Sequence, residues 1–125
     1  MKNIRIGQKE IIHFIGIGGI GMSGLAQVMK TMGFKIQGSD QNKNKSTSSC
    51  SKAGIKVFIG HARKNIKNAT IVVKSSAIKD NNEEIRQAKK RKIPIYSRAD
   101  VLANLSLIHI SEPRDRLLSR MPSSA

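Results

Sequence analysis

A glycine-rich segment near the start of the chain has the residue types needed to bind a diphosphate. Gly16-Ile-Gly18-Gly19-Ile-Gly21 has the spacing G-x-G-x-x-G and directly follows an apolar run over residues 11–17. Between a strand and a helix, the first glycine permits a tight turn, the second lets the backbone approach a pyrophosphate, and the third packs helix against strand. Unpaired N–H groups and the helix dipole attract the anion. We therefore expect a diphosphate over residues 18–22.

An acidic residue follows the loop at the distance expected for a nucleoside contact. Asp40 lies at the end of the second predicted strand, and in such folds an acidic side chain about 20 residues past the loop accepts a hydrogen bond from a ribose hydroxyl. The pattern favours a nucleoside diphosphate as the ligand. The same loop also serves NAD in dehydrogenases, so an NAD-binding domain remains an alternative.

Short apolar strands alternate with helices along the chain. Strands are expected at 11–17, 34–38, 56–60, 71–74 and 93–96, and helices at 21–32, 82–92 and from 98 to 105. Such alternation implies parallel pairing through right-handed crossovers. The sequence therefore predicts an α/β, Rossmann-like open parallel sheet of about five strands with helices on both faces. Residues 45–54 offer almost nothing apolar to bury, so the crossover helix expected there should be short or frayed.

Composition is typical of a soluble globular protein with one domain. The 125 residues are 38% hydrophobic and 25% charged, and no apolar run reaches the roughly 18 to 20 residues that span a bilayer. The first ten residues lack the apolar stretch of a signal peptide. We expect a cytoplasmic protein without a membrane partner. Cys50 is the only cysteine, so we expect a free thiol and no metal site.

The net charge of +15 raises the hypothesis of a basic nucleic-acid-binding module, since Lys and Arg neutralise phosphates. The basic residues are scattered, with one block at residues 89–92, and the aromatic residues lie inside apolar runs, so no base-stacking platform is apparent. A bias towards A/T-rich codons also explains the abundance of Lys, Asn and Ile. We predict no nucleic-acid partner and keep this module as a second alternative.

The segment from Ile12 to Ala26 closely resembles the opening motif of UDP-N-acetylmuramate–L-alanine ligases, a group of Mur ligases. Further segments resemble the family in the same order: Gly38-Ser-Asp40, Gly60-His61, residues 73–78 and residues 93–102. The resemblance implies that residues 1–104 form the N-terminal domain, which binds the UDP part of UDP-N-acetylmuramate. A related recycling ligase, which adds a whole peptide, shares this domain, but its glycine loop usually differs at residues 18–22.

The resemblance also implies which residues bind the substrate. Gly16 is expected among the substrate-binding residues, and those expected to hold the diphosphate are Gly18, Gly19, Ile20, Gly21, Met22 and Ser23. Ser39 and Asp40 are expected to face the nucleoside, and Ser75, Ser76 and Ala77 to line the cleft beyond the fourth strand. His61 matches the Gly-His pair of the family and is either a ligand contact or a solvated loop residue.

Two further side chains are interpreted from their positions in the chain. His13 lies inside the first predicted strand, so we expect a packed histidine. Arg98 opens a helix; it is interpreted as an exposed side chain, with a charge-assisted contact to a phosphate as the alternative.

The resemblance implies an ATP-dependent reaction for the parent enzyme. ATP converts the lactyl carboxylate into an acyl phosphate, the alanine amine attacks, and magnesium neutralises the transferred phosphoryl group. The family places the ATP site in a later domain, on a Gly-x-x-Gly-Lys-Thr loop that this sequence lacks. We therefore expect a truncated, inactive chain that only positions substrate, with no catalytic residue and no cofactor of its own. Its partners would be UDP-N-acetylmuramate and the missing ATPase and C-terminal domains.

Residues 105–125 depart from the family pattern. The stretch from Leu105 to Pro113 resembles the conceptual translation of a transposase-type DNA-sequencing adapter, and that from Ser119 to Ala125 resembles the flow-cell end of the same adapter. We therefore interpret residues 105–125 as an artefactual tail, expect it to be disordered, and assign it no function.

Overall fold

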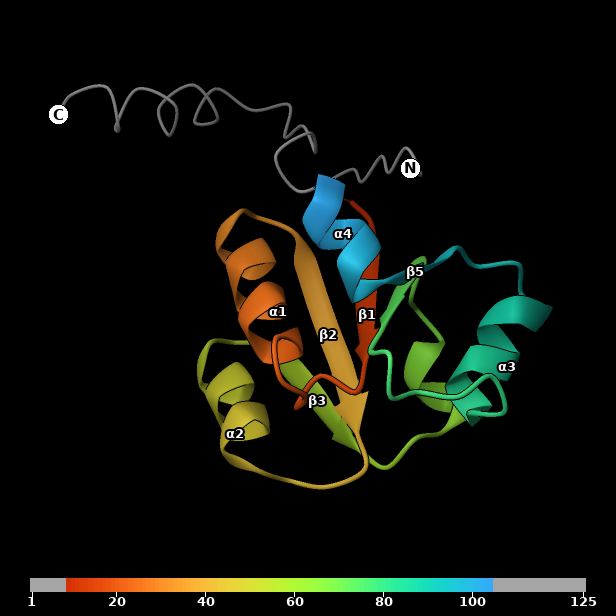
Figure 1. The fold of residues 1–125 in the computed structure, drawn as a ribbon, viewed down its shortest axis with the longest axis horizontal. Coiled ribbons are helices and arrows are strands. Elements are labelled where there is room, and N and C mark those ends of the chain that lie inside the picture. Colours follow the sequence, from red (N-terminus) through yellow and green to blue (C-terminus); the bar gives the residue numbers. More distant parts are fainter. Residues whose placement is uncertain (1–8, 105–125) are drawn as a thin grey trace, which may run out of the picture.

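A five-stranded parallel sheet organises the molecule (Figure 1). The computed structural model describes residues 9–104, so the predictions for the tail lie outside the described residues. The strands are β1 (Ile11–Ile15), β2 (Lys35–Asp40), β3 (Lys56–Ile59), β4 (Ile71–Lys74) and β5 (Ile95–Ser97), in the spatial order β3-β2-β1-β4-β5. All four strand pairs are parallel, which confirms the α/β, Rossmann-like prediction.

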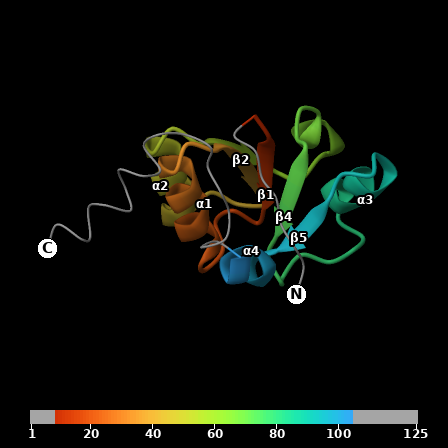
Figure 2. The same cartoon turned by 90° about the horizontal axis from the view of Figure 1, so that it is seen from above.

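Helices cover both faces of this sheet (Figure 2). One face carries α1 (Met22–Thr31), α2 (Lys45–Lys52) and α4 (Arg98–Asn104). The other carries the short 3-10 helix η1 (Arg63–Ile66) and α3 (Glu83–Lys90). No helix within residues 9–104 is long and apolar enough to cross a membrane.

Two apolar clusters fill the spaces between the sheet and its helices. Ile12 and Phe14 of β1 pack with α1 and α4, whereas Ile15 packs with η1 and α3. Successive side chains of a strand point to opposite faces, so the continuous apolar run of β1 is explained by burial on both sides. This alternation also directs His13 towards the η1 and α3 face, where it is fully buried as predicted.

The helix α2 forms although its sequence is almost entirely polar. At its start the Asn44 side chain accepts from the Thr47 amide at 2.8 Å, and the Thr47 hydroxyl accepts from the Asn44 amide at 2.8 Å. This capping box satisfies two backbone donors that a helix start leaves unpaired. The helix buries only Thr47 and Cys50. Cys50 is a free thiol, as predicted, and burial raises its pKa against the opposing hydrogen bond from Gln27.

Candidate functional site

The glycine loop between β1 and α1 is anchored to the end of β2. The amides of Gly16 and Ile17 both donate to the Ser39 carbonyl, at 2.8 and 3.0 Å. Gly21, at the N-cap of α1, has φ +80°, in the left-handed region that glycine adopts without steric cost. The loop therefore turns tightly across the carboxyl end of the sheet and directs the start of α1 towards that edge.

The loop leaves a set of backbone donors unused. The Gly18 amide donates to Asp40 Oδ2 at 2.8 Å, and the Met22 amide donates to the Gly19 carbonyl at 3.1 Å. Between Gly16 and Gly24, the backbone amides with no acceptor among the described residues are those of Ile20, Gly21, Ser23 and Gly24. They lie at the N-terminus of a ten-residue helix, where the dipole favours an anion.

Arg98 lies against this set of amides. It begins α4 directly after β5, and a Cβ added to Gly21 would lie 3.1 Å from Arg98 Nη1 and 3.3 Å from Cζ. No acceptor for its guanidinium is found in the described part of the chain. Arg98 is partly buried, so the interpretation as an exposed side chain is wrong. The structure places a cation beside Gly21, in the loop that holds the four N–H groups.

Gly18 permits close packing between the loop and the start of α2. A Cβ at this position would lie 2.8 Å from Thr47 Cγ2, 2.9 Å from Asp40 Oδ2 and 3.0 Å from Asn44 Nδ2. These distances are too short for a side chain, so any other residue at this position would displace the capped start of α2 or the Asp40 carboxylate. One Asp40 oxygen already holds the Gly18 amide, and its contact with a ribose stays a prediction.

The segment after β4 borders the same loop. The Ser75 Cβ lies 3.3 Å, and its hydroxyl 3.9 Å, from Cβ positions built at Gly16 and Gly19 respectively. Ser76 and Ala77 follow as exposed residues. The structure thus brings Ser75 to the glycine loop, and places the next two residues at the same edge of the sheet.

Ser39 and Asp40 lie in successive positions of β2, where side chains point to opposite faces. Asp40 points to the glycine loop, whereas the Ser39 side chain is completely buried on the η1 and α3 face. The Ser39 hydroxyl donates to Glu84 Oε1 at 2.6 Å and lies 3.0 Å from His61 Nδ1. Its expected contact with a nucleoside stays a prediction.

Glu84 of α3 is the centre of a buried polar cluster. The cluster consists of His13, Gln37, Ser39, His61, Asn65 and Glu84. Glu84 Oε1 accepts from His13 Nε2 at 2.7 Å, and Oε2 accepts from Asn65 Nδ2 at 2.7 Å and from the Ala62 amide at 3.0 Å. Burial tends to raise the pKa of Glu84, but the hydrogen bond and electrostatic interaction with His13, followed by hydrogen bonds from Ser39 and Asn65, lower it to about 2. The carboxylate is therefore ionised although it is buried.

Gln37 determines which nitrogen of His13 accepts a hydrogen bond. Its amide nitrogen donates to the Asn65 carbonyl at 2.9 Å and to His13 Nδ1 at 2.8 Å. A backbone carbonyl can only accept, which sets the orientation of the Gln37 amide, so Nδ1 must accept as well. His13 Nε2 then donates to Glu84 at 2.7 Å.

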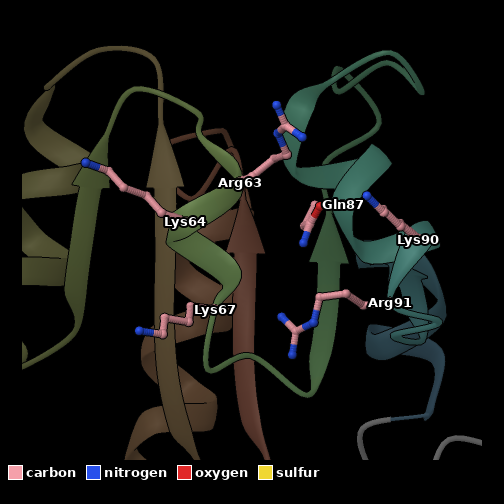
Figure 3. A pocket seen from close by; sticks show the side chains of 6 residues that line it. All are labelled: Arg63, Lys64, Lys67, Gln87, Lys90 and Arg91. Carbon is pink, nitrogen blue, oxygen red and sulfur yellow. The ribbon is translucent and has the colours of Figure 1, made fainter.

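A separate hollow of about 630 Å³ lies between η1 and α3 (Figure 3). Its lining residues are Arg63, Lys64, Lys67, Gln87, Lys90 and Arg91. Arg91 donates to the Ile66 carbonyl at 2.6 Å, and Arg63 pairs with Glu83 at 3.4 Å. No aromatic side chain lines the hollow, so the surface lacks a platform for base stacking. Nor does any group of three His, Cys, Asp or Glu residues among residues 9–104 suit a metal ion.

Comparison with known proteins gives a consistent match. The family model described as "Mur ligase family, catalytic domain" matches residues 11–109. The UDP-N-acetylmuramate–L-alanine ligase of Pelagibacter ubique is 57% identical over 82% of this chain and 22% of its own length. That of Rickettsia typhi is 54% identical over 80% of this chain and 20% of its own length. The chain thus spans about a fifth of the length of these curated relatives.

Solved structures agree with this match. The UDP-N-acetylmuramate–alanine ligase of Thermotoga maritima aligns with a TM-score of 0.71 at 32% identity, over 89% of this chain and 23% of that chain. A UDP-N-acetylmuramate:L-alanyl-gamma-D-glutamyl-meso-diaminopimelate ligase from Neisseria meningitides also aligns with a TM-score of 0.71, at 26% identity, over 76% of this chain and 30% of that chain. The fold is therefore common to both kinds of ligase.

Proposed function

Because the chain belongs to the Mur ligase family, we propose that it binds the UDP part of UDP-N-acetylmuramate for a ligase that adds L-alanine in peptidoglycan biosynthesis. The L-alanine enzyme is favoured over the peptide-adding ligase by the 57% identity to the Pelagibacter ubique protein. Binding of the nucleotide would position the muramate carboxylate for a reaction carried out elsewhere in the ligase.

One observation carries the proposal: amides and a guanidinium that have no acceptor among residues 9–104 lie in the same loop region around Gly21. The amides of Ile20, Gly21, Ser23 and Gly24 have no acceptor within residues 9–104, and the Arg98 guanidinium lies beside them at Gly21. A diphosphate supplies the oxygens that these groups need, through charge-assisted hydrogen bonds that are stronger than neutral ones. The diphosphate is therefore assigned to residues 20–24, slightly further along α1 than the sequence predicts.

The rest of the nucleotide follows from that placement. Asp40 and His61 lie at the carboxyl ends of β2 and β3, where open α/β sheets bind their ligands. The ribose is assigned to the Asp40 side and the base to the His61 side. Ser75 borders the loop and is assigned to the muramate side of the cleft, together with Ser76 and Ala77.

ATP and magnesium have no assigned residues in this chain. Its sequence holds no Gly-x-x-Gly-Lys-Thr loop, and the described residues offer no metal cluster. We assign ATP, magnesium and the chemical step to the part of the ligase that the longer relatives possess, and expect this chain to be inactive when tested alone.

Thermal unfolding of the chain with added ligand tests the proposal. A ligand that binds only the native state raises its stability by about 2.7 kcal/mol at a hundredfold excess over Kd. We expect UDP-N-acetylmuramate to raise the melting temperature and NAD to leave it unchanged. A shift with NAD instead would identify a dinucleotide-binding domain.

A DNA oligomer should bind weakly and lose its affinity steeply with salt; tight binding at physiological salt would support the nucleic-acid alternative.

A further inference from the structure

We propose that Glu84 is a positioning residue that orients His61 so that its Nε2 accepts a hydrogen bond from the base, and so selects uracil over cytosine. The inference rests on the proposed function, because it requires a uridine nucleotide at the carboxyl edge of the sheet. It adds to that function a buried carboxylate that touches no ligand, and a chemical reason for base specificity.

The first step is the direction of the hydrogen bonds around Ser39. The carboxylate of Glu84 is ionised and can only accept, so the single hydroxyl proton of Ser39 is donated to Glu84 Oε1 at 2.6 Å. The Ser39 oxygen lies 3.0 Å from His61 Nδ1 and has no second proton to give. It must therefore accept from His61, which places a proton on Nδ1.

The second step is the charge that faces this proton. Glu84 Oε2 lies 3.5 Å from His61 Nδ1, and the Glu84 side chain is completely buried. A negative charge on that side stabilises the Nδ1–H form of the ring. In the neutral imidazole the other nitrogen, Nε2, then carries a lone pair and is an acceptor.

The third step is the place of the ring in the fold. His61 follows the end of β3, and Ile59 of β3 pairs with Asp40 of β2. The Gly60 amide donates to the Asp40 carbonyl at 2.7 Å, so the histidine lies next to the strand end that holds the glycine loop. Its side chain remains 12% exposed, and no partner for Nε2 is found among the described residues. The ring thus presents an unused acceptor at the edge assigned to the base.

An acceptor at this point discriminates between pyrimidines. Uracil has an N–H donor at N3, whereas cytosine has a lone pair there, which would face the lone pair of Nε2. A site whose buried polar group is left unpaired by the wrong ligand loses affinity for it. The pyrimidine preference would therefore depend on the tautomer of His61, and the tautomer on Glu84.

Long-range ¹H–¹⁵N correlation of the histidine rings, recorded on the wild-type chain without ligand, tests the tautomers directly. We expect the His61 proton on Nδ1 and the His13 proton on Nε2. A His61 ring that carries a proton on Nε2, either alone or together with one on Nδ1, would overturn the inference, whatever the chain binds.

Affinities for UDP and CDP then test the specificity. We expect the wild-type chain to bind UDP about tenfold more tightly than CDP. Glu84→Gln keeps the shape but lets residue 84 donate a proton, so the ratio should fall towards one. The matched control is Glu83→Gln, on the same helix, where the side chain is exposed and forms an ion pair with Arg63; its ratio should stay unchanged.

The outcomes separate the two levels of the argument. Absence of UDP binding by the wild-type chain would overturn the proposed function. Equal affinity for UDP and CDP, with UDP binding intact, would overturn only the role of His61. A folded Glu84→Gln variant that keeps the full preference would overturn the role of Glu84. If that variant does not fold, the tautomers of the wild-type chain still decide.

Discussion

The two sides of β2 handle polar groups in opposite ways. On the α1 side, the glycine loop leaves four amides and the Arg98 guanidinium without acceptors in the described structure. On the α3 side, the Glu84 carboxylate accepts hydrogen bonds from His13, Ser39 and Asn65. Ile20, Gly21 and Gly24 are exposed, so their amides are accessible to an anionic ligand at the start of the helix. A saturated cluster instead fixes the geometry of the groups around it.

Replacing the centre of the saturated side should have the largest effect. Glu84→Leu removes an acceptor that three buried side chains share, and each donor would then lose its partner. We expect a loss of about 3 to 5 kcal/mol in the free energy of unfolding, measured by urea denaturation. Glu83→Leu, on the exposed side of the same helix, should stay within about 0.5 kcal/mol. Similar losses for both variants would show that the buried cluster does not contribute more to the free energy of unfolding than an exposed side chain does.

Acid should weaken the same side. The pKa of Glu84 is lowered from its ordinary 4.5 to about 2 in the folded chain, so the folded state binds this proton less readily than the unfolded state. The resulting stability is present above pH 4.5 and is lost as the pH falls towards 2. It amounts to roughly 3 kcal/mol. Denaturation across this range should show a steep loss in the wild-type chain and a shallower one in Glu84→Gln.

The open side should respond in binding and not in stability. Arg98 has no partner to lose within residues 9–104, so Arg98→Ala should leave the melting temperature of the free chain nearly unchanged. Affinity for UDP should fall about tenfold or more, because a charged donor to the diphosphate is removed. The control is Arg86→Ala, at an exposed position of α3, and this variant should bind UDP like the wild type. Unchanged affinity in Arg98→Ala would place the diphosphate elsewhere.

The smallest expected effect has the opposite sign. A Cβ added to Gly24 meets nothing within 4 Å, and the residue lies in the first turn of α1. Gly24→Ala should therefore stabilise the chain by about 0.5 to 1 kcal/mol, because alanine loses less backbone entropy in a helix. Thermal unfolding measures the change. A destabilised variant would mean that the first turn of α1 has less room than the structure gives it.

The sequence predicted the sheet well, because buried parallel strands and amphipathic helices have local patterns. β4 was expected at 71–74 and is found there, and β1 is only shorter than expected at its end. The helix α2 was harder to predict, since its capping box and two buried side chains leave almost no apolar periodicity. Asn44 followed three residues later by Thr47 was the available signal, and it is a weaker form of the usual Ser/Thr-x-x-Glu pattern.

Asp40 and Ser75 were predicted at the glycine loop from separate sequence motifs and lie there, whereas residues outside such motifs were missed. Glu84 was missed because it lies in a charged run at the start of a surface helix, and its partner His13 is 71 residues away. No local pattern records such a contact. The separation of Ser39 and Asp40 onto two faces follows from the strand period, and was predictable once β2 was extended to residue 40. The position of Arg98 over Gly21 depends on how α4 returns to the loop, which only the fold shows.

The single cysteine allows the local opening of α2 to be measured by thiol labelling. Cys50 is fully buried, and a thiol-labelling reagent needs an accessible thiolate. Labelling therefore requires the helix to detach, and its rate at low reagent concentration reports the fraction of molecules in which the helix is detached. A short polar helix with two buried side chains belongs to the regions expected to open locally, before the sheet unfolds. The capped end of α2 packs against Gly18, so a ligand that stabilises the glycine loop should slow the labelling of Cys50. The labelling rate would then report ligand binding at the loop without an engineered cysteine.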